Sequence, residues 1–429
     1  MTCNNPQPDN PTLFSEQQSS CRLLPLVFYR TAIAIIIGML TSPAFVYGTG
    51  PTQQNVSDIT SDSLSIEQRH SREIQELKDR LTFLEEQQSS ILDEIAQRVI
   101  LGGYGALEFE SFQGSNTTFE GKLEVLVSGQ IHDRIRFYNE IDLGIPDGTA
   151  EAEQAYVDFL LSKSFNLRGG VILVPFGKWN LDHFDPRRDL TDRPLVARQI
   201  VPTTWGDLGA SIFGFIPWAS NMISTYEVAV INGLTDNFSS TNGGLQNAKS
   251  DLGRDNNGNK AVVGRATLKF VDQYEIGFSG YRGASDPSDK KTISGYDVDF
   301  EFKPRGVPIW EDFEFKGEFA TFHINKTSKP SRLYGYYLQT NYHFWPSWLN
   351  ESFLGNPFNH PTFTLVGRYD HAKISTTAGT GDLTEDRFTI GLNYRPIEDY
   401  VIKTEYQINN GGIERKSWNG FLASIAWLF

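Results

Sequence analysis

From Leu101 to the end of the chain, hydrophobic and polar side chains alternate with a period of two residues. In 122–131, KLEVLVSGQI, one face is apolar and the other carries Lys122 and Glu124. In 296–302, YDVDFEF, aromatic and apolar residues alternate with carboxylates. This period predicts β-strands with two different faces. Charges standing directly between aromatic residues favour a barrel wall with lipid outside and water inside over a sandwich core.

Sixteen segments follow this pattern, and an even number is what a bacterial single-chain barrel requires. Short links such as 271–273 alternate with long ones such as 232–259, which is typical of periplasmic turns and external loops. We therefore predict an all-β transmembrane barrel of antiparallel strands over 101–429, although fourteen or eighteen strands also fit. The segments are 103–111, 119–131, 134–143, 152–162, 166–174, 207–216, 222–231, 260–271, 274–283, 292–302, 311–323, 331–342, 361–372, 386–396, 400–407 and 420–429.

The polar faces of these strands carry charges of both signs. In a barrel those faces line the lumen. The lumen wall is therefore expected to include Arg134, Arg136, Arg265, Lys269, Asp297, Asp299, Glu314, Lys316 and Arg368.

The N-terminal part carries an export pattern. An apolar core at 31–40 follows Arg22 and Arg30 and precedes small residues, so 1–48 is expected to be a cleaved signal peptide. An uncleaved N-terminal anchor is the alternative. The two cysteines of the chain lie within this segment. The mature protein would then have no disulfide and no thiolate chemistry. A polar linker follows at 49–66.

Between the linker and the barrel the apolar period changes to 3.5. The segment 67–100 is expected to be a periplasmic α-helical coiled coil of about three heptads. So short a helix has little stability alone, which favours association with copies of itself. A single amphipathic helix packed on the barrel is the alternative. The seam positions are Ile74, Leu77, Leu81, Leu84, Ile91 and Ile95.

The last ten residues, GFLASIAWLF, alternate to an aromatic end. This segment resembles the terminal strand of outer-membrane proteins, whose final Phe is read by the barrel assembly machinery. The resemblance implies that Trp427 and Phe429 form an assembly signal and that outer-membrane lipid surrounds the wall.

Two longer segments resemble the phosphate-selective porin O and P-like family. They are 166–214, with its Val-Pro-Phe-Gly strand end and following loop, and 386–406, with its Gly-Leu-Asn-Tyr core. The resemblance implies a homotrimer of sixteen-stranded barrels with a loop folded into the pore. Anion-selective members line the pore with many Arg and Lys. This chain has a net charge of −14 and mixes both signs on its inward faces, so strong phosphate selectivity is not expected.

The segment 175–206 follows the fifth predicted strand and is rich in proline and charge. Porins narrow their lumen with such a loop, and charged rings there set selectivity. In one interpretation the loop charges face the solute; in the other they pair with each other and with the wall and hold the loop in place. The expected constriction residues are Lys178, Asp185, Arg187, Arg188, Arg193 and Arg198.

The acidic net charge and the absence of common catalytic motifs exclude several classes of function. An acidic chain lacks the basic footprint that nucleic acid requires. We find no HExxH, GxSxG or GxxxxGK[ST] motif, so no cofactor, metal or catalytic residue is predicted. Some outer-membrane barrels are enzymes, and His132, His323 and His371 are candidates by residue type only.

The prediction for function is a porin of the Gram-negative outer membrane. It would be a passive diffusion channel for small hydrophilic solutes with a mild preference for anions. The alternative is a barrel that serves as a structural anchor, with the coiled coil as a tether to the cell wall.

Overall fold

The computed structural model describes Lys78 and residues 98–429, except 146–147, 239–243, 251, 253–254, 271–272, 326–330, 376–381 and 413–417. The predicted signal peptide, linker and nearly all of the coiled coil lie outside the described residues. In the described part of the chain no helix is long and apolar enough to cross a membrane.

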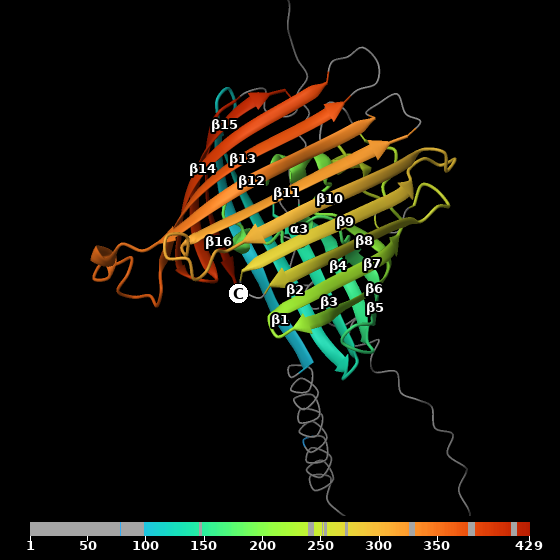
Figure 1. The fold of residues 1–429 in the computed structure, drawn as a ribbon, viewed down its shortest axis with the longest axis horizontal. Helices are drawn as coiled ribbons and strands as arrows, with labels where there is room; N and C mark the ends of the chain where they lie inside the picture. Colours follow the sequence, from blue (N-terminus) through green and yellow to red (C-terminus); the bar gives the residue numbers. More distant parts are fainter. Residues whose placement is uncertain are drawn as a thin grey trace, which may run out of the picture. The chain divides into compact units, whose positions relative to one another are not determined.

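Sixteen antiparallel strands form a closed barrel in which each strand pairs with its neighbours in sequence and β1 pairs with β16 (Figure 1). The predicted barrel of sixteen antiparallel strands is confirmed. Most predicted ends lie within a few residues of the observed ones, and β1 begins two residues earlier than the predicted barrel. The strands are β1 (Val99–Phe112), β2 (Thr118–His132), β3 (Ile135–Gly144), β4 (Thr149–Leu160), β5 (Asn166–Leu173), β6 (Gly206–Ala219), β7 (Met222–Ile231), β8 (Ala261–Phe270), β9 (Tyr274–Ala284), β10 (Thr292–Phe302), β11 (Phe313–Ile324), β12 (Arg332–Phe344), β13 (Thr362–Ser375), β14 (Leu383–Ile397), β15 (Tyr400–Gly411) and β16 (Gly420–Leu428).

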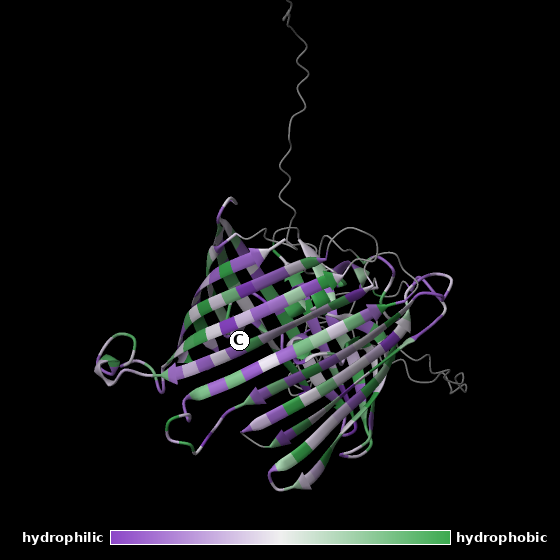
Figure 2. Cartoon of the chain, turned by 45° about the horizontal axis from the view of Figure 1, so that its top comes forward, coloured by the Kyte–Doolittle hydropathy of each residue, from purple (hydrophilic) through white to green (hydrophobic). Residues whose placement is uncertain are grey.

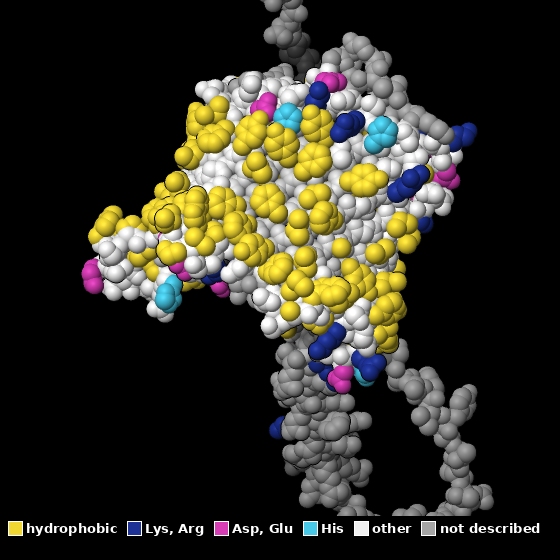
Figure 3. All heavy atoms as spheres, viewed as in Figure 1, with side chains coloured by type: hydrophobic (Ala, Val, Ile, Leu, Met, Phe, Trp, Pro, Cys, Tyr) yellow, Lys and Arg dark blue, Asp and Glu magenta, His cyan; other side chains and the backbone are white. Residues whose placement is uncertain are grey.

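The outer wall of the barrel is apolar. Hydropathy alternates along the strands (Figure 2), and the residues that point outward are large hydrophobics such as Val228, Val262 and Phe278. Hydrophobic side chains cover much of the visible outer face, and charged ones lie mainly toward its ends (Figure 3). A soluble protein rarely exposes so large a continuous apolar surface. This surface is suited to lipid.

The connections define two ends of the barrel. One end, which we call the loop end, holds the two longest connections, 174–205 and 232–260. The opposite end holds the chain's C-terminus, and we call it the C-terminal end. It has two-residue turns at 133–134 and 398–399 but also the longer connection 345–361, which includes η4 (Ser347–Leu349).

The interior is not a uniformly wet channel. The connection 174–205 contains α3 (Lys178–Leu181), η1 (Asp185–Arg187) and η2 (Val196–Ile200), and 232–260 contains η3 (Gln246–Ala248). Apolar residues of both connections pack with inward-facing apolar residues of β7–β13 in one buried cluster, which includes Trp205, Leu245 and Phe322. In the sequence these places appear as short continuous apolar runs, such as 171–174, VILV, and 228–231, VAVI, where the alternation is interrupted.

Candidate pore and its constriction

The connection 174–205, hereafter the inner loop, begins with a tight backbone closure. The Val174 N–H donates to the Trp205 carbonyl at 2.8 Å, and the Trp205 N–H donates to the Asn180 side-chain oxygen at 2.8 Å. Gly177 has φ 74°, and an added Cβ there would lie 2.6 Å from Glu318 Oε1. Only glycine meets both conditions without strain. These contacts turn the chain away from the wall immediately after β5.

The inner loop then reaches the opposite wall. The Thr191 N–H donates to Glu405 on β15 at 2.6 Å, and the Leu195 N–H donates to Asp370 on β13 at 3.1 Å. The Asp192 carboxylate accepts from Arg387 on β14 at 2.8 Å. Contacts on strands so far along the chain place the loop across the interior of the barrel.

Asp189 is one of the strongest anchors of the loop. Its carboxylate accepts from Lys316 Nζ at 2.8 Å and from the amides of Gln339 and Asn341 at 2.9 Å each. Burial alone would raise the pKa of Asp189, but the Lys316 charge and these hydrogen bonds lower that pKa to about 2. The carboxylate therefore stays ionised at neutral and mildly acidic pH.

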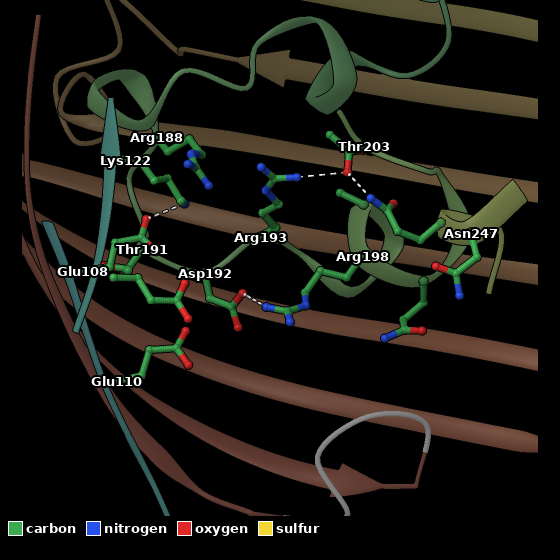
Figure 4. Close-up of a pocket in the computed structure, with 14 residues that line it drawn as sticks. Glu108, Glu110, Lys122, Arg188, Thr191, Asp192, Arg193, Arg198, Thr203 and Asn247 are labelled. Carbon is green, nitrogen blue, oxygen red and sulfur yellow. Dashed lines mark hydrogen bonds and ion pairs between the residues drawn. The ribbon is translucent and has the colours of Figure 1, made fainter. Parts of the chain in front are cut away.

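A cavity of about 410 Å³ opens on the side of the inner loop toward the loop end of the barrel (Figure 4). Its ionisable lining consists of four acids and four bases. Lys122 donates to Glu108 at 2.9 Å, and Arg193 donates to the Thr203 carbonyl at 2.9 Å. The eight groups are Glu108, Glu110, Glu120, Asp192, Lys122, Arg188, Arg193 and Arg198.

A second cavity, of about 820 Å³, lies on the other side, toward the C-terminal end. Here the balance of charge is different, with six bases and three acids. Arg136, Arg265 and Lys269 also have acidic partners nearby, Asp158, Asp299 and Glu275. The nine groups are Arg136, Lys163, Lys178, Arg187, Arg265, Lys269, Asp182, Glu227 and Glu275.

Solved outer-membrane proteins share this architecture. OmpF of Salmonella typhi, solved in a complex with daunomycin, aligns with a TM-score of 0.52 at 8% identity over 77% of this chain and 97% of that chain. A loop L8 deletion mutant of the outer-membrane protein OmpT of Vibrio cholerae gives 0.51 at 11% identity, over 77% and 99%. The anion-selective porin from Comamonas acidovorans gives 0.50 at 9% identity, over 77% and 99%.

The fold is that of the outer-membrane porins. At these identities the likeness concerns the fold alone. An uncharacterized protein of Aquifex aeolicus is 25% identical over 365 residues, which are 78% of this chain and 81% of that protein. No protein-family profile matches the chain. Membership of the phosphate-selective family therefore stays a prediction.

The structure divides the predicted constriction residues between the two cavities. Lys178 and Arg187 line the one toward the C-terminal end, whereas Arg188, Arg193 and Arg198 line the one toward the loop end. Asp185 is buried and pairs with Arg188. Arg187 and Arg188 are adjacent in the sequence but line different cavities, because η1 ends at Arg187 and the backbone of Arg188 is extended.

Several predicted wall residues do not line the two cavities. Asp297 and Asp299 are buried, and Lys316 binds Asp189 of the inner loop. Arg134 lies in the turn between β2 and β3 and is exposed. Arg368 does point inward, but it is buried beneath the inner loop, where it donates to the Asp192 carbonyl at 3.1 Å. Its role is therefore to hold the loop. The remaining predicted wall residues lie on strands, and of these Asp297, Asp299, Glu314 and Lys316 come from β10 and β11.

Functional groups on the first strands were missed as site residues. Glu108 and Lys122 lie on β1 and β2 and line the cavity toward the loop end. Alternation places both on polar faces, which is the signal that identifies them. The three candidate histidines lie on separate strands: His132 on β2, His323 on β11, and His371 on β13, where it pairs with Asp386 at 2.8 Å.

Proposed function

We propose that this protein is a passive diffusion channel of the Gram-negative outer membrane for small hydrophilic solutes. The observation that carries the proposal is a closed barrel with an apolar outside and charged, open cavities on both sides of an inner loop. Polar groups that line a narrow passage replace part of the hydration shell of a passing solute. An inert anchor needs no such lining.

The charge of the two cavities supports a mild preference for anions. Four acids balance four bases toward the loop end, while six bases face three acids toward the C-terminal end. Charges inside low-dielectric walls are screened less than surface charges, so the excess of bases acts on a passing ion. Most of these bases have acidic partners, which keeps the effect small.

Assembly as a homotrimer in the outer membrane belongs to the same proposal. The heptads at 67–98 supply a means of self-association, and the resemblance to trimeric porins supplies the number.

Single-channel recording in a planar bilayer tests the proposal. The purified protein should give discrete conductance steps, and the reversal potential in a KCl gradient should show a small excess of chloride permeability. Liposome swelling in small sugars should separate a channel from an anchor. Protein that inserts as a folded barrel but neither conducts nor admits sugars would overturn the proposal.

A further inference from the structure

A group of four ionisable side chains lies between the inner loop and the wall formed by β2, β3 and β4. Glu124, Glu140 and Glu153 come from these three strands in turn, and His183 comes from the inner loop. One ligand atom from each lies within 4.8 Å of the others. None of the four lies among the cavity groups that carry the proposed channel function.

An irregularity of the sheet brings the third carboxylate into the group. Gln154 pairs with Glu140, and Ala152 pairs with the next residue, Ile141, so Glu153 is the extra residue of a β-bulge. Counted along a regular strand from the inward Asp158, Glu153 would point toward lipid. The bulge turns it inward, where its Oε2 lies 3.1 Å from His183 Nε2. Bulges re-aim side chains in this way next to functional sites.

The group is largely buried, and each of its four side chains has at least one polar atom without a hydrogen bond among the described residues. His183 is only 2% exposed, and both of its ring nitrogens are without a hydrogen-bond partner among the described residues. The same holds for one oxygen of each of the three glutamates. His183 Nε2 lies 3.1 Å from Glu153 Oε2 and 3.3 Å from Glu140 Oε1, within ion-pair distance of a protonated ring, but neither contact has the geometry of a hydrogen bond. Buried polar groups almost always have partners, so these converging atoms are suited to a shared ligand.

A supporting contact orients one of the carboxylates. Gln154 donates through its amide to Glu140 Oε2, which leaves Oε1 facing His183. Outer contacts of this kind hold metal ligands in place. Glu153 also lines an open cavity of about 560 Å³ beside Lys249, so an ion from the aqueous interior has a path to the group.

We propose that Glu124, Glu140, Glu153 and His183 bind one divalent transition-metal ion. Three carboxylates supply the negative charge that a buried dication requires. The imidazole selects ions such as Zn²⁺ or Mn²⁺ over Ca²⁺ and Mg²⁺, which take oxygen ligands. A bound ion joins the inner loop, through His183, to three strands of the wall. The site therefore stabilises the position of the loop and does not depend on whether the barrel conducts.

Titration of the full-length protein with metal tests this proposal. The protein should carry no polyhistidine tag, and bound metal should first be removed with a chelator. Calorimetry should show one Zn²⁺ or Mn²⁺ per chain and weaker binding of Ca²⁺. Zinc X-ray absorption should show one imidazole among oxygen ligands. Zn²⁺ should also raise the melting temperature of the barrel.

Two variants and a control make the test specific. His183→Gln should weaken Zn²⁺ binding by more than the about 10- to 100-fold that loss of an outer contact costs. Glu153→Gln, at the least buried of the four positions, should do the same if His183→Gln fails to fold. His371→Gln changes a histidine paired with Asp386 on another strand and should bind as the wild type does. The absence of Zn²⁺ binding, wild-type affinity for Zn²⁺ in both His183→Gln and Glu153→Gln, or tighter binding of Ca²⁺ than of Zn²⁺ would each overturn the proposal.

Discussion

At the scale of single residues, burial decides which charges act on solute and which hold the loop. Arg187 is exposed in the cavity toward the C-terminal end, with its guanidinium 5.3 Å from the Phe184 ring centroid. Arg188 is only 4% exposed and pairs with Asp185. Adjacent residues of the same type therefore have different functions.

Separate alanine variants test this difference. Arg187→Ala should shift the reversal potential toward cations and leave stability within about 0.5 kcal/mol, as exposed substitutions usually do. Arg188→Ala removes the nearer partner of the buried Asp185 carboxylate and leaves Lys122 Nζ 3.7 Å away, so it should cost roughly 3 kcal/mol, the lower end of the range for a broken buried pair. Chemical unfolding and bilayer recordings of both variants check these outcomes. Equal effects of the two variants on both measurements would contradict the assignment.

The pH dependence of the loop anchor follows from Asp189. Its folded-state pKa is lowered to about 2, below its ordinary value of 3.8. The stabilisation is therefore complete above the ordinary value and is lost as pH falls through about 2. Because Asp189 stays ionised and holds the inner loop in this range, channel conductance should be constant from about pH 8 to 5 and should change only in strong acid. Asp189→Asn should remove that acid transition; an unchanged transition in this variant would assign it to another group.

At the scale of elements, the inner loop depends on a glycine where it leaves the wall. Gly177→Ala places a Cβ against Glu318 and forces a left-handed backbone on alanine, which costs about 1–2 kcal/mol. The loop should be less well held, with noisier conductance and a lower melting temperature. At Gly169, on β5, an added Cβ meets nothing within 4 Å, so Gly169→Ala is the matched control. Similar behaviour of the two variants would exclude a special role for Gly177.

The last strand carries the prediction about assembly. Phe429 is 61% exposed, and its backbone pairs with Gly103 of β1 in both directions at 3.0 Å. Deletion of Phe429 should lower the amount of folded, heat-modifiable barrel in the outer membrane at ordinary expression levels. β1 pairs with β16 as far as Leu428, so the barrel closes without Phe429. The amount of folded protein in the membrane should therefore fall by more than the stability of the refolded protein does. Unchanged amounts in the membrane would count against an assembly signal.

At the scale of the whole molecule, the oligomer is predicted to depend on the segment before the barrel. Deletion of 51–98 should weaken association without unfolding the barrel, because β1 begins at Val99 and every strand pair remains. Mass measurement in mild detergent checks this, with melting temperature as the control for folding. A monomer with the segment intact would refute the prediction.

Alternation along the chain was sufficient to predict the barrel. It specifies which face of most strands meets lipid, because a shift by one residue would expose the charges to lipid, and it predicts the strand number that the structure confirms. The sequence also located the inner loop by length and charge.

The roles of the loop charges and the meeting point of the four candidate ligands depend on contacts between distant parts of the chain. Arg187 and Arg188 are equivalent in composition and separate only through the local backbone. Glu153 points inward only because of a bulge. The adjacent polar residues Glu153 and Gln154 mark a break in the alternation, but the pattern does not show which residue the sheet leaves unpaired. Glu124, Glu140 and His183 come together across two strands and a loop. Such contacts depend on how far the chain returns across the lumen, which no local period encodes.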